Sequence, residues 1–120
     1  MDQSLTIYCY SRCSTCRKAL SWLSDQGIAH TVVDITTEPP SRQLLEQAVT
    51  YFGDRKPLFN TSGQSYRALG SAVVKAMGDQ EALDALAADG KLIKRPFLAL
   101  ENGTFLVGFK PEVWSDALLG

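Results

Sequence analysis

The sequence has few of the residues that build metal centres and disulfide frameworks. Its 120 residues include three cysteines and one histidine, His30. Structural zinc sites draw several cysteine or histidine ligands together, and no second close pair accompanies Cys13 and Cys16. We therefore expect no bound metal and no cofactor held by the chain. His30 has no acidic partner nearby in the sequence and is interpreted as a surface or half-buried residue without a catalytic part.

The chain also lacks an excess of positive charge and a long apolar run. Its net charge is -1, which offers no broad positive field to nucleic acids or membrane surfaces. No stretch approaches the roughly 20 apolar residues that span a bilayer, and the first residues do not form a signal peptide. We expect a cytoplasmic monomer that binds neither membranes nor nucleic acid directly. The cytosol keeps ordinary thiols reduced, so the cysteines are not expected to form a structural framework.

The periodicity of apolar residues predicts alternating strands and helices in one domain, residues 1–120. Alternation over 5–10 and 31–35 indicates two strands around a helix over 15–26, which Gly27 is placed to end. Asn102 and Gly103 predict a hairpin with a tight primed turn. The remaining expected elements are helices over 41–52, 64–69, 80–88 and 111–118 and hairpin strands over 97–100 and 104–107.

This order predicts an α/β protein of thioredoxin-like fold. The core is expected to be of the glutaredoxin type, with a mixed four-stranded sheet. A helical insertion over about residues 38–93 is expected between the second and third strands.

Cys13 and Cys16 are the candidate catalytic residues. Cys13 lies where the first strand leads into the first helix, so the helix dipole and the nearby Arg12 favour its thiolate. Cys16 follows one turn later, where it could resolve a mixed disulfide or sulfenic acid on Cys13 and leave a Cys13–Cys16 disulfide. The alternative is that a cysteine is a small buried hydrophobic residue. That alternative stays open for Cys16 and is the interpretation for Cys9, in the middle of the alternating strand.

Pro96 and Arg95 form the second feature with a chemical role. A proline directly before a strand can adopt the cis form at modest cost and place a turn beside the reactive sulfur. Arg95 could present its guanidinium to an anion near Cys13. The alternative is that Lys94 and Arg95 belong to a solvated patch after a helix.

Several ordered motifs resemble those of the arsenate reductase (ArsC) superfamily. They run from about Leu5 to Trp114 and are Cys13-Ser-Thr-Cys16-Arg-Lys-Ala, Phe59-Asn60-Thr-Ser-Gly63, Tyr66-Arg67, Leu69-Gly70, Leu92-Ile-Lys-Arg95-Pro96 and Val107-Gly-Phe-Lys110. The superfamily includes glutaredoxin-coupled arsenate reductases, glutathione-dependent thiol reductases and Spx-type regulators that bind RNA polymerase. A thiol oxidoreductase with glutathione or glutaredoxin as electron donor is therefore the function that the resemblance implies.

The resemblance implies that, in the arsenate reductases, a cysteine at the position of Cys13 attacks arsenate while three arginines hold the oxyanion. Arg95 matches one of them, whereas the other two would fall near Asn60 and Gly108. Two departures of three put arsenate reduction in doubt, and the substrate attacked by Cys13 stays open between an oxyanion and a thiol mixed disulfide. The candidate substrate-binding residues are Arg12, Ser14, Thr15, Asn60, Arg95 and Pro96.

The Spx-type regulators share the two cysteines and the Arg-Pro step, and their switch is a disulfide between the cysteines. A redox regulator acting through the RNA polymerase α subunit is therefore the alternative function. Many such regulators carry a basic C-terminal tail, and residues 116–120 of this chain are not basic. We rank the reductase first.

Overall fold

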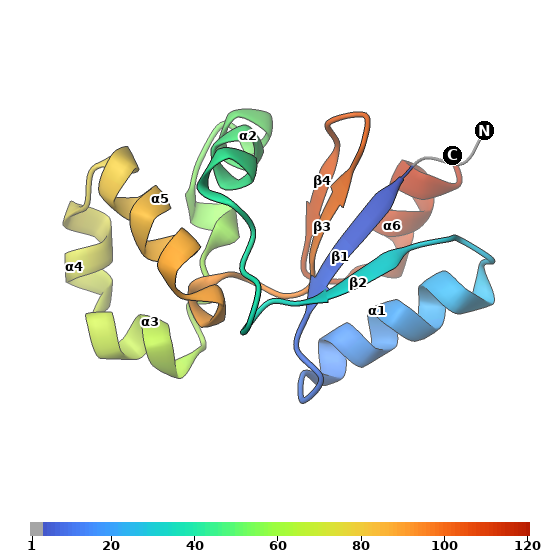
Figure 1. Cartoon of the computed structure of the whole chain (residues 1–120), viewed down its shortest axis with the longest axis horizontal. Coiled ribbons are helices and arrows are strands. Elements are labelled where there is room, and N and C mark those ends of the chain that lie inside the picture. Colours follow the sequence, from blue (N-terminus) through green and yellow to red (C-terminus); the bar gives the residue numbers. More distant parts are fainter. Residues whose placement is uncertain (1–3) are drawn as a thin grey trace. The chain divides into compact units, whose positions relative to one another are not determined.

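The computed structural model describes residues 4–120, which divide into two compact units. The first unit contains the residues up to 33 and from 95 to the C-terminus, and the second contains residues 34–94. In Figure 1 the strands, α1 and α6 belong to the first unit, and α2 to α5 belong to the second. No helix among the described residues is long and apolar enough to cross a membrane.

A four-stranded sheet forms the centre of the first unit. Its strands are β1 (Leu5–Cys9), β2 (Thr31–Asp34), β3 (Phe97–Leu100) and β4 (Phe105–Val107). The order across the sheet is β2-β1-β3-β4, and β3 is antiparallel to both β1 and β4. The mixed four-stranded sheet expected from the sequence is confirmed. The register pairs Leu5 with Leu100 and Tyr8 with Phe97, so the end of β1 lies beside the start of β3.

Two helices of this unit bury their apolar residues in the same core as the sheet. They are α1 (Ser14–Asp25) and α6 (Pro111–Leu118). Alternate residues of β1 are buried, and α1 buries Cys16, Ala19 and Leu23 at helical spacing. The core cluster also contains Leu98, Leu106 and Trp114. Gly27 follows α1 with a φ of 68°, the left-handed conformation expected from the sequence.

The hairpin between β3 and β4 forms where predicted, with a different turn. The amide of Gly103 donates to the carbonyl of Leu100 at 3.0 Å, and the amide of Leu100 donates to the carbonyl of Thr104 at 2.9 Å. A primed two-residue turn needs a positive φ at both central residues, whereas only Gly103 has one here, at 90°. The prediction of a tight primed turn was therefore wrong, and a three-residue loop with a left-handed glycine replaces it.

The second unit is helical. Its helices are α2 (Arg42–Phe52), α3 (Gln64–Leu69), α4 (Ser71–Ala76) and α5 (Asp79–Ala88), with 3-10 helices at Lys56–Leu58 and Gly90–Leu92. The sequence did not predict α4, because this six-residue helix buries only Val74 and shows no helical repeat. Gly70, with a φ of 91°, separates α4 from α3. Arg42 of α2 contacts Asp84 of α5 at 2.6 Å, which links the two longer helices.

One glycine of the second unit has no room for a side chain. A Cβ on Gly90 would lie 1.8 Å from the carbonyl oxygen of Ile35. Both residues are buried. The 3-10 helix at Gly90–Leu92 can therefore approach the chain after β2 only with glycine at this position.

Candidate active site

Cys13 occupies the N-cap of α1, directly after the turn that leaves β1. Its amide donates to the carbonyl of Tyr10 at 2.9 Å, and its extended backbone (φ -88°, ψ 115°) is typical of an N-cap. Its Sγ accepts a hydrogen bond from the amide of Cys16 at 3.4 Å. The side chain is half-buried. The sulfur therefore takes the place of the usual capping oxygen, at the positive end of a 12-residue helix.

Cys16 lies one turn further along α1, with only 1% of its surface exposed. The Cys9 thiol, the Tyr10 backbone and the Cys13 side chain all act on its sulfur. These groups, with Cys9 contributing most, lower the pKa of Cys16 to about 6 although burial of the charge acts in the opposite direction. The positive charge of Arg95 adds a smaller contribution of the same sign. The sequence placed the favoured thiolate on Cys13, and the structure shows a lowered pKa on Cys16.

The segment before β3 contributes Arg95 and Pro96 to the same unit. The peptide bond between them is cis, as expected from the sequence. Pro96 is buried, and its carbonyl accepts the Gly108 amide at 3.0 Å. The Arg95 guanidinium carbon lies 5.3 Å from the centre of the Tyr10 ring, within range of a cation–π interaction. Arg95 is half-buried and acts on Cys16, so it is not part of a fully solvated patch.

The other candidate substrate-binding residues differ in position. Arg12 and Ser14 flank Cys13 and are exposed, whereas Thr15 is half-buried. Asn60 belongs to the second unit, where its amide donates to the carbonyl of Leu92 at 2.7 Å. The Asn60 side chain packs against Gly63. Substrate binding by these residues stays a prediction.

Two contributors to the site were missed by the sequence reasoning. Cys9 was interpreted as a core residue and is indeed 4% exposed, but its thiol also contacts Cys16. Tyr10 provides both a backbone donor to Cys16 and a ring for Arg95. The sequence did hold a signal for Cys9, because it lies on the inward face of β1 and Cys16 lies on the inward face of α1.

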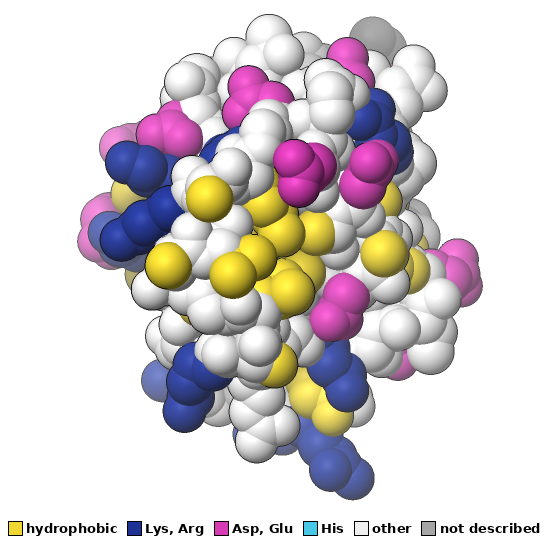
Figure 2. Space-filling model, turned by 90° about the vertical axis from the view of Figure 1, so that its left-hand side faces the viewer, with side chains coloured by type: hydrophobic (Ala, Val, Ile, Leu, Met, Phe, Trp, Pro, Cys, Tyr) yellow, Lys and Arg dark blue, Asp and Glu magenta, His cyan; other side chains and the backbone are white. Residues whose placement is uncertain are grey.

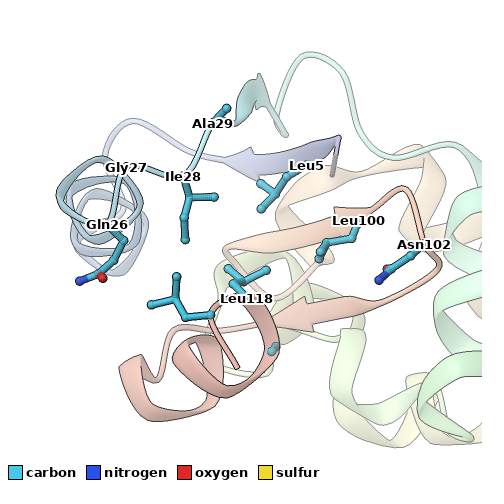
Figure 3. A pocket seen from close by; sticks show the side chains of 10 residues that line it. Leu5, Gln26, Gly27, Ile28, Ala29, Leu100, Asn102 and Leu118 are labelled. Atoms are coloured by element: carbon cyan, nitrogen blue, oxygen red, sulfur yellow. The ribbon is translucent and has the colours of Figure 1, made fainter. Parts of the chain in front are cut away.

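Neither of two surface pockets is lined by a cysteine. One pocket of about 350 Å³ lies in the first unit near Leu5, at the opposite end of β1 from Cys9. Figure 3 shows Leu5, Ile28 and Leu118 around it. Among the described residues, no group of three histidine, cysteine or acidic side chains is arranged to hold a metal ion.

The second pocket, of about 610 Å³, lies in the helical unit. Phe59, Tyr66 and Val74 line it together with Arg55, Lys56 and Lys75. Figure 2 looks onto the side where α3 and α4 lie in Figure 1 and shows apolar side chains gathered between charged ones. Leu69 of α3 and Val73 of α4 are both exposed. The sequence analysis did not anticipate this surface, because its residues come from three short segments.

Comparison with curated proteins finds both reductases and regulators. The chain is 41% identical to the uncharacterised protein YusI of Bacillus subtilis over 94% of this chain and 97% of the relative. It is 34% identical to an arsenate reductase of Rhizobium meliloti, covering 86% and 74%. It is 29% identical to the regulatory protein MgsR of Bacillus subtilis, covering 92% and 87%.

Solved structures with the same fold cover nearly the whole chain. An ArsC family related protein from Bacteroides fragilis superposes with a TM-score of 0.86 at 37% identity, covering 94% of this chain and 96% of its own. A possible arsenate reductase from Streptococcus mutans superposes with a TM-score of 0.83 at 40% identity, covering 91% and 93%. The thioredoxin-like fold class is thereby confirmed. The ArsC family model matches residues 8–117, and the chain is a member of the ArsC family.

Proposed function

We propose that this ArsC family protein is a dithiol oxidoreductase that reduces mixed disulfides of glutathione or similar small thiols, with Cys13 as nucleophile and Cys16 as resolving thiol. The observation that carries the proposal is the pair itself. A half-buried sulfur at a helix N-cap lies one turn from a buried sulfur whose pKa is lowered to about 6. Such a pair has both the accessible thiol and the internal thiolate that disulfide exchange requires.

The reaction begins at Cys13, which is the more exposed of the two. In the reduced site the Cys13 thiol donates to the Cys16 thiolate. As the Cys13 sulfur attacks the substrate disulfide, its proton passes to Cys16, the substrate S–S bond breaks and one thiolate leaves. That thiolate takes the proton from Cys16.

In the second step the Cys16 thiolate attacks Cys13 Sγ. The bond between Cys13 and the substrate breaks, a Cys13–Cys16 disulfide forms, and the second substrate thiol is released after taking a proton from water. The two protein thiols have then supplied two electrons. An external thiol, glutathione directly or through glutaredoxin, returns the protein to the dithiol state.

Arg95 supports a substrate with a carboxylate, such as glutathione. Its guanidinium stacks over Tyr10 and contributes positive charge to the thiolate site. The positions where the resemblance implies two further arginines hold Asn60 and Gly108. A single arginine suits one carboxylate better than a multiply charged tetrahedral oxyanion, which favours thiol reduction over arsenate reduction.

The second candidate is a redox-sensing transcriptional regulator. The likeness to MgsR over 92% of the chain supports it, and the same Cys13–Cys16 disulfide would be its switch. The partner would be the C-terminal domain of the RNA polymerase α subunit.

The test follows release of a peptide from its mixed disulfide with glutathione, in excess glutathione with and without glutaredoxin, by chromatography. Wild-type protein should accelerate the release, and Cys13→Ser should not. Cys16→Ser, mixed with the peptide disulfide before glutathione is added, should accumulate a mixed disulfide on Cys13, visible by intact mass. Arsenate replaces the disulfide in a parallel reaction and should not be turned over.

A wild-type rate equal to that of Cys13→Ser would contradict the proposal. Redox-dependent binding of the α-subunit domain, measured by calorimetry on dithiol and disulfide protein, would then favour the regulator.

A further inference from the structure

Tyr10 is an aromatic residue whose ring the proposed reaction leaves unused. It follows β1 directly, and its carbonyl accepts the Cys13 amide at 2.9 Å. The antiparallel register of β1 and β3 pairs Tyr8 with Phe97, and the same register continued by two residues sets Tyr10 opposite Arg95. Residues opposite each other on antiparallel strands are close enough for their side chains to interact. The strand pairing therefore brings the Tyr10 ring and the Arg95 guanidinium together at the end of β1 that leads to Cys13.

The contact between the two side chains has the geometry of a cation–π pair. The guanidinium carbon of Arg95 lies over the Tyr10 ring, 5.3 Å from its centre. Both residues are half-buried. The negative face of the ring attracts the cation and restricts a long side chain that has several rotatable bonds. Tyr10 thus limits the positions that the Arg95 guanidinium can take.

Arg95 has no acidic partner in the described part of the chain. Arg42 and Arg55 each form an ion pair, with Asp84 and Asp79 respectively. No acidic side chain of residues 4–120 forms an ion pair with Arg95. Stacking uses the face of a guanidinium and leaves the N–H groups on its edge, which match a carboxylate in bidentate geometry. The pair therefore offers an anion a positioned cation that no carboxylate of residues 4–120 neutralises.

We propose that Tyr10 is a positioning residue for substrate choice, whose ring holds the Arg95 guanidinium for the carboxylate of a thiol substrate. The pair then selects mixed disulfides of carboxylate-bearing thiols, such as glutathione, over those of neutral thiols. One turn of the chain serves both ends of the substrate, because the Tyr10 carbonyl also accepts the amide of the nucleophile Cys13. Tyr10 forms no bond to the substrate and exchanges no proton with it. Its hydroxyl has no part in this role.

The inference rests on the proposed function for its substrate, while the stacking can be measured on the protein alone. The ring current of Tyr10 should shift the Arg95 Nε–H proton upfield in nitrogen-15 NMR spectra. In Tyr10→Leu this signal should move back toward that of a free arginine, and in Tyr10→Phe, which keeps the ring face, it should stay. The matched control is Tyr8→Leu, which removes a ring that packs on Phe97 two residues earlier in β1 and should leave the signal in place.

Substrate choice is measured with one peptide in two mixed disulfides, one with glutathione and one with 2-mercaptoethanol, which is neutral. Tyr10→Leu should lower the ratio of the two kcat/KM values by about 10-fold, mainly through a higher KM for the glutathione disulfide. Tyr10→Phe and Tyr8→Leu should keep the ratio of wild type. In an Arg95→Ala background, Tyr10→Leu should lower the ratio no further, because the ring acts only through Arg95.

Binding of S-methylglutathione, which has the carboxylates but no reactive sulfur, separates the inference from the reaction. Its dissociation constant, followed by the NMR signals, should rise about 10-fold in Tyr10→Leu and stay near the wild-type value in Tyr10→Phe. An equal dissociation constant in wild type and Tyr10→Leu, an Nε–H signal that is the same in both, or an equal rise in Tyr8→Leu would overturn the inference. If the dissociation constant rises as expected and yet wild type turns over no disulfide, the proposed function fails and the role of Tyr10 stands.

Discussion

The ionisation of Cys16 couples the stability of the reduced protein to pH. The pKa of Cys16 is lowered from 9.0 to about 6 in the folded protein, so the unfolded chain binds more protons between these values. The free energy of unfolding must then rise with pH across this interval. The contribution is fully present above about pH 9 and is lost as the pH falls through about 6. Between pH 6 and pH 8.5 it amounts to about 3 kcal/mol.

Urea unfolding with a non-thiol reductant measures this contribution, and the fluorescence of Trp22 and Trp114 reports it. The comparison is with Cys16→Ser, in which the other titrating groups remain. Cys9 is coupled to Cys16, but its ordinary pKa of 9.0 lies above the interval and its contribution to the difference is small. Wild type should gain about 3 kcal/mol more than the variant between pH 6 and pH 8.5. Equal gains in the two proteins would refute the assignment of the thiolate to Cys16.

Three further predictions address individual contacts. Arg95→Ala should lower the rate of disulfide turnover by about 10- to 1000-fold while leaving the urea midpoint nearly unchanged. A rate equal to that of wild type would contradict a role of Arg95 in the reaction. Trp114→Ala should lower the free energy of unfolding, measured in urea, by about 3–5 kcal/mol, because this large residue is only 1% exposed. A decrease below about 1 kcal/mol would contradict its place in the core. Gly90→Ala should lower the melting temperature because its Cβ meets the Ile35 carbonyl, whereas Gly78→Ala, with open space at the Cβ, should change it little. Equal melting temperatures for the two glycine variants would contradict the close approach.

Local patterns in the sequence predicted most elements of the first unit. The alternation over residues 5–10 and the helical repeat over 15–26 appear as β1 and α1, because each element buries one face in a single core. The final helix, Pro111–Leu118, has the predicted bounds. In contrast, α4 has one buried residue and left no periodic signal. The hairpin was located by Asn102 and Gly103, but residue types alone did not distinguish a primed turn from a longer loop with one positive φ.

The candidate site was predictable to the extent that its residues are neighbours in the sequence. Cys13 and Cys16 are one turn apart, so their proximity follows from the helix. The contact of Arg95 with Tyr10 depends on β3 pairing beside β1, a long-range register that no local pattern specifies. The same limit applies to Cys9, which shares a buried cluster with Cys16 only because the inward faces of β1 and α1 meet.

The strand order has a consequence for behaviour at high concentration. The two outer strands of the sheet are short, with four residues in β2 and three in β4. After β4, Gly108 turns the chain away with a φ of 68° and directs its amide to the carbonyl of Pro96. Each outer strand therefore offers only a short edge for pairing with a neighbouring molecule. The folded protein should resist aggregation through its sheet edges.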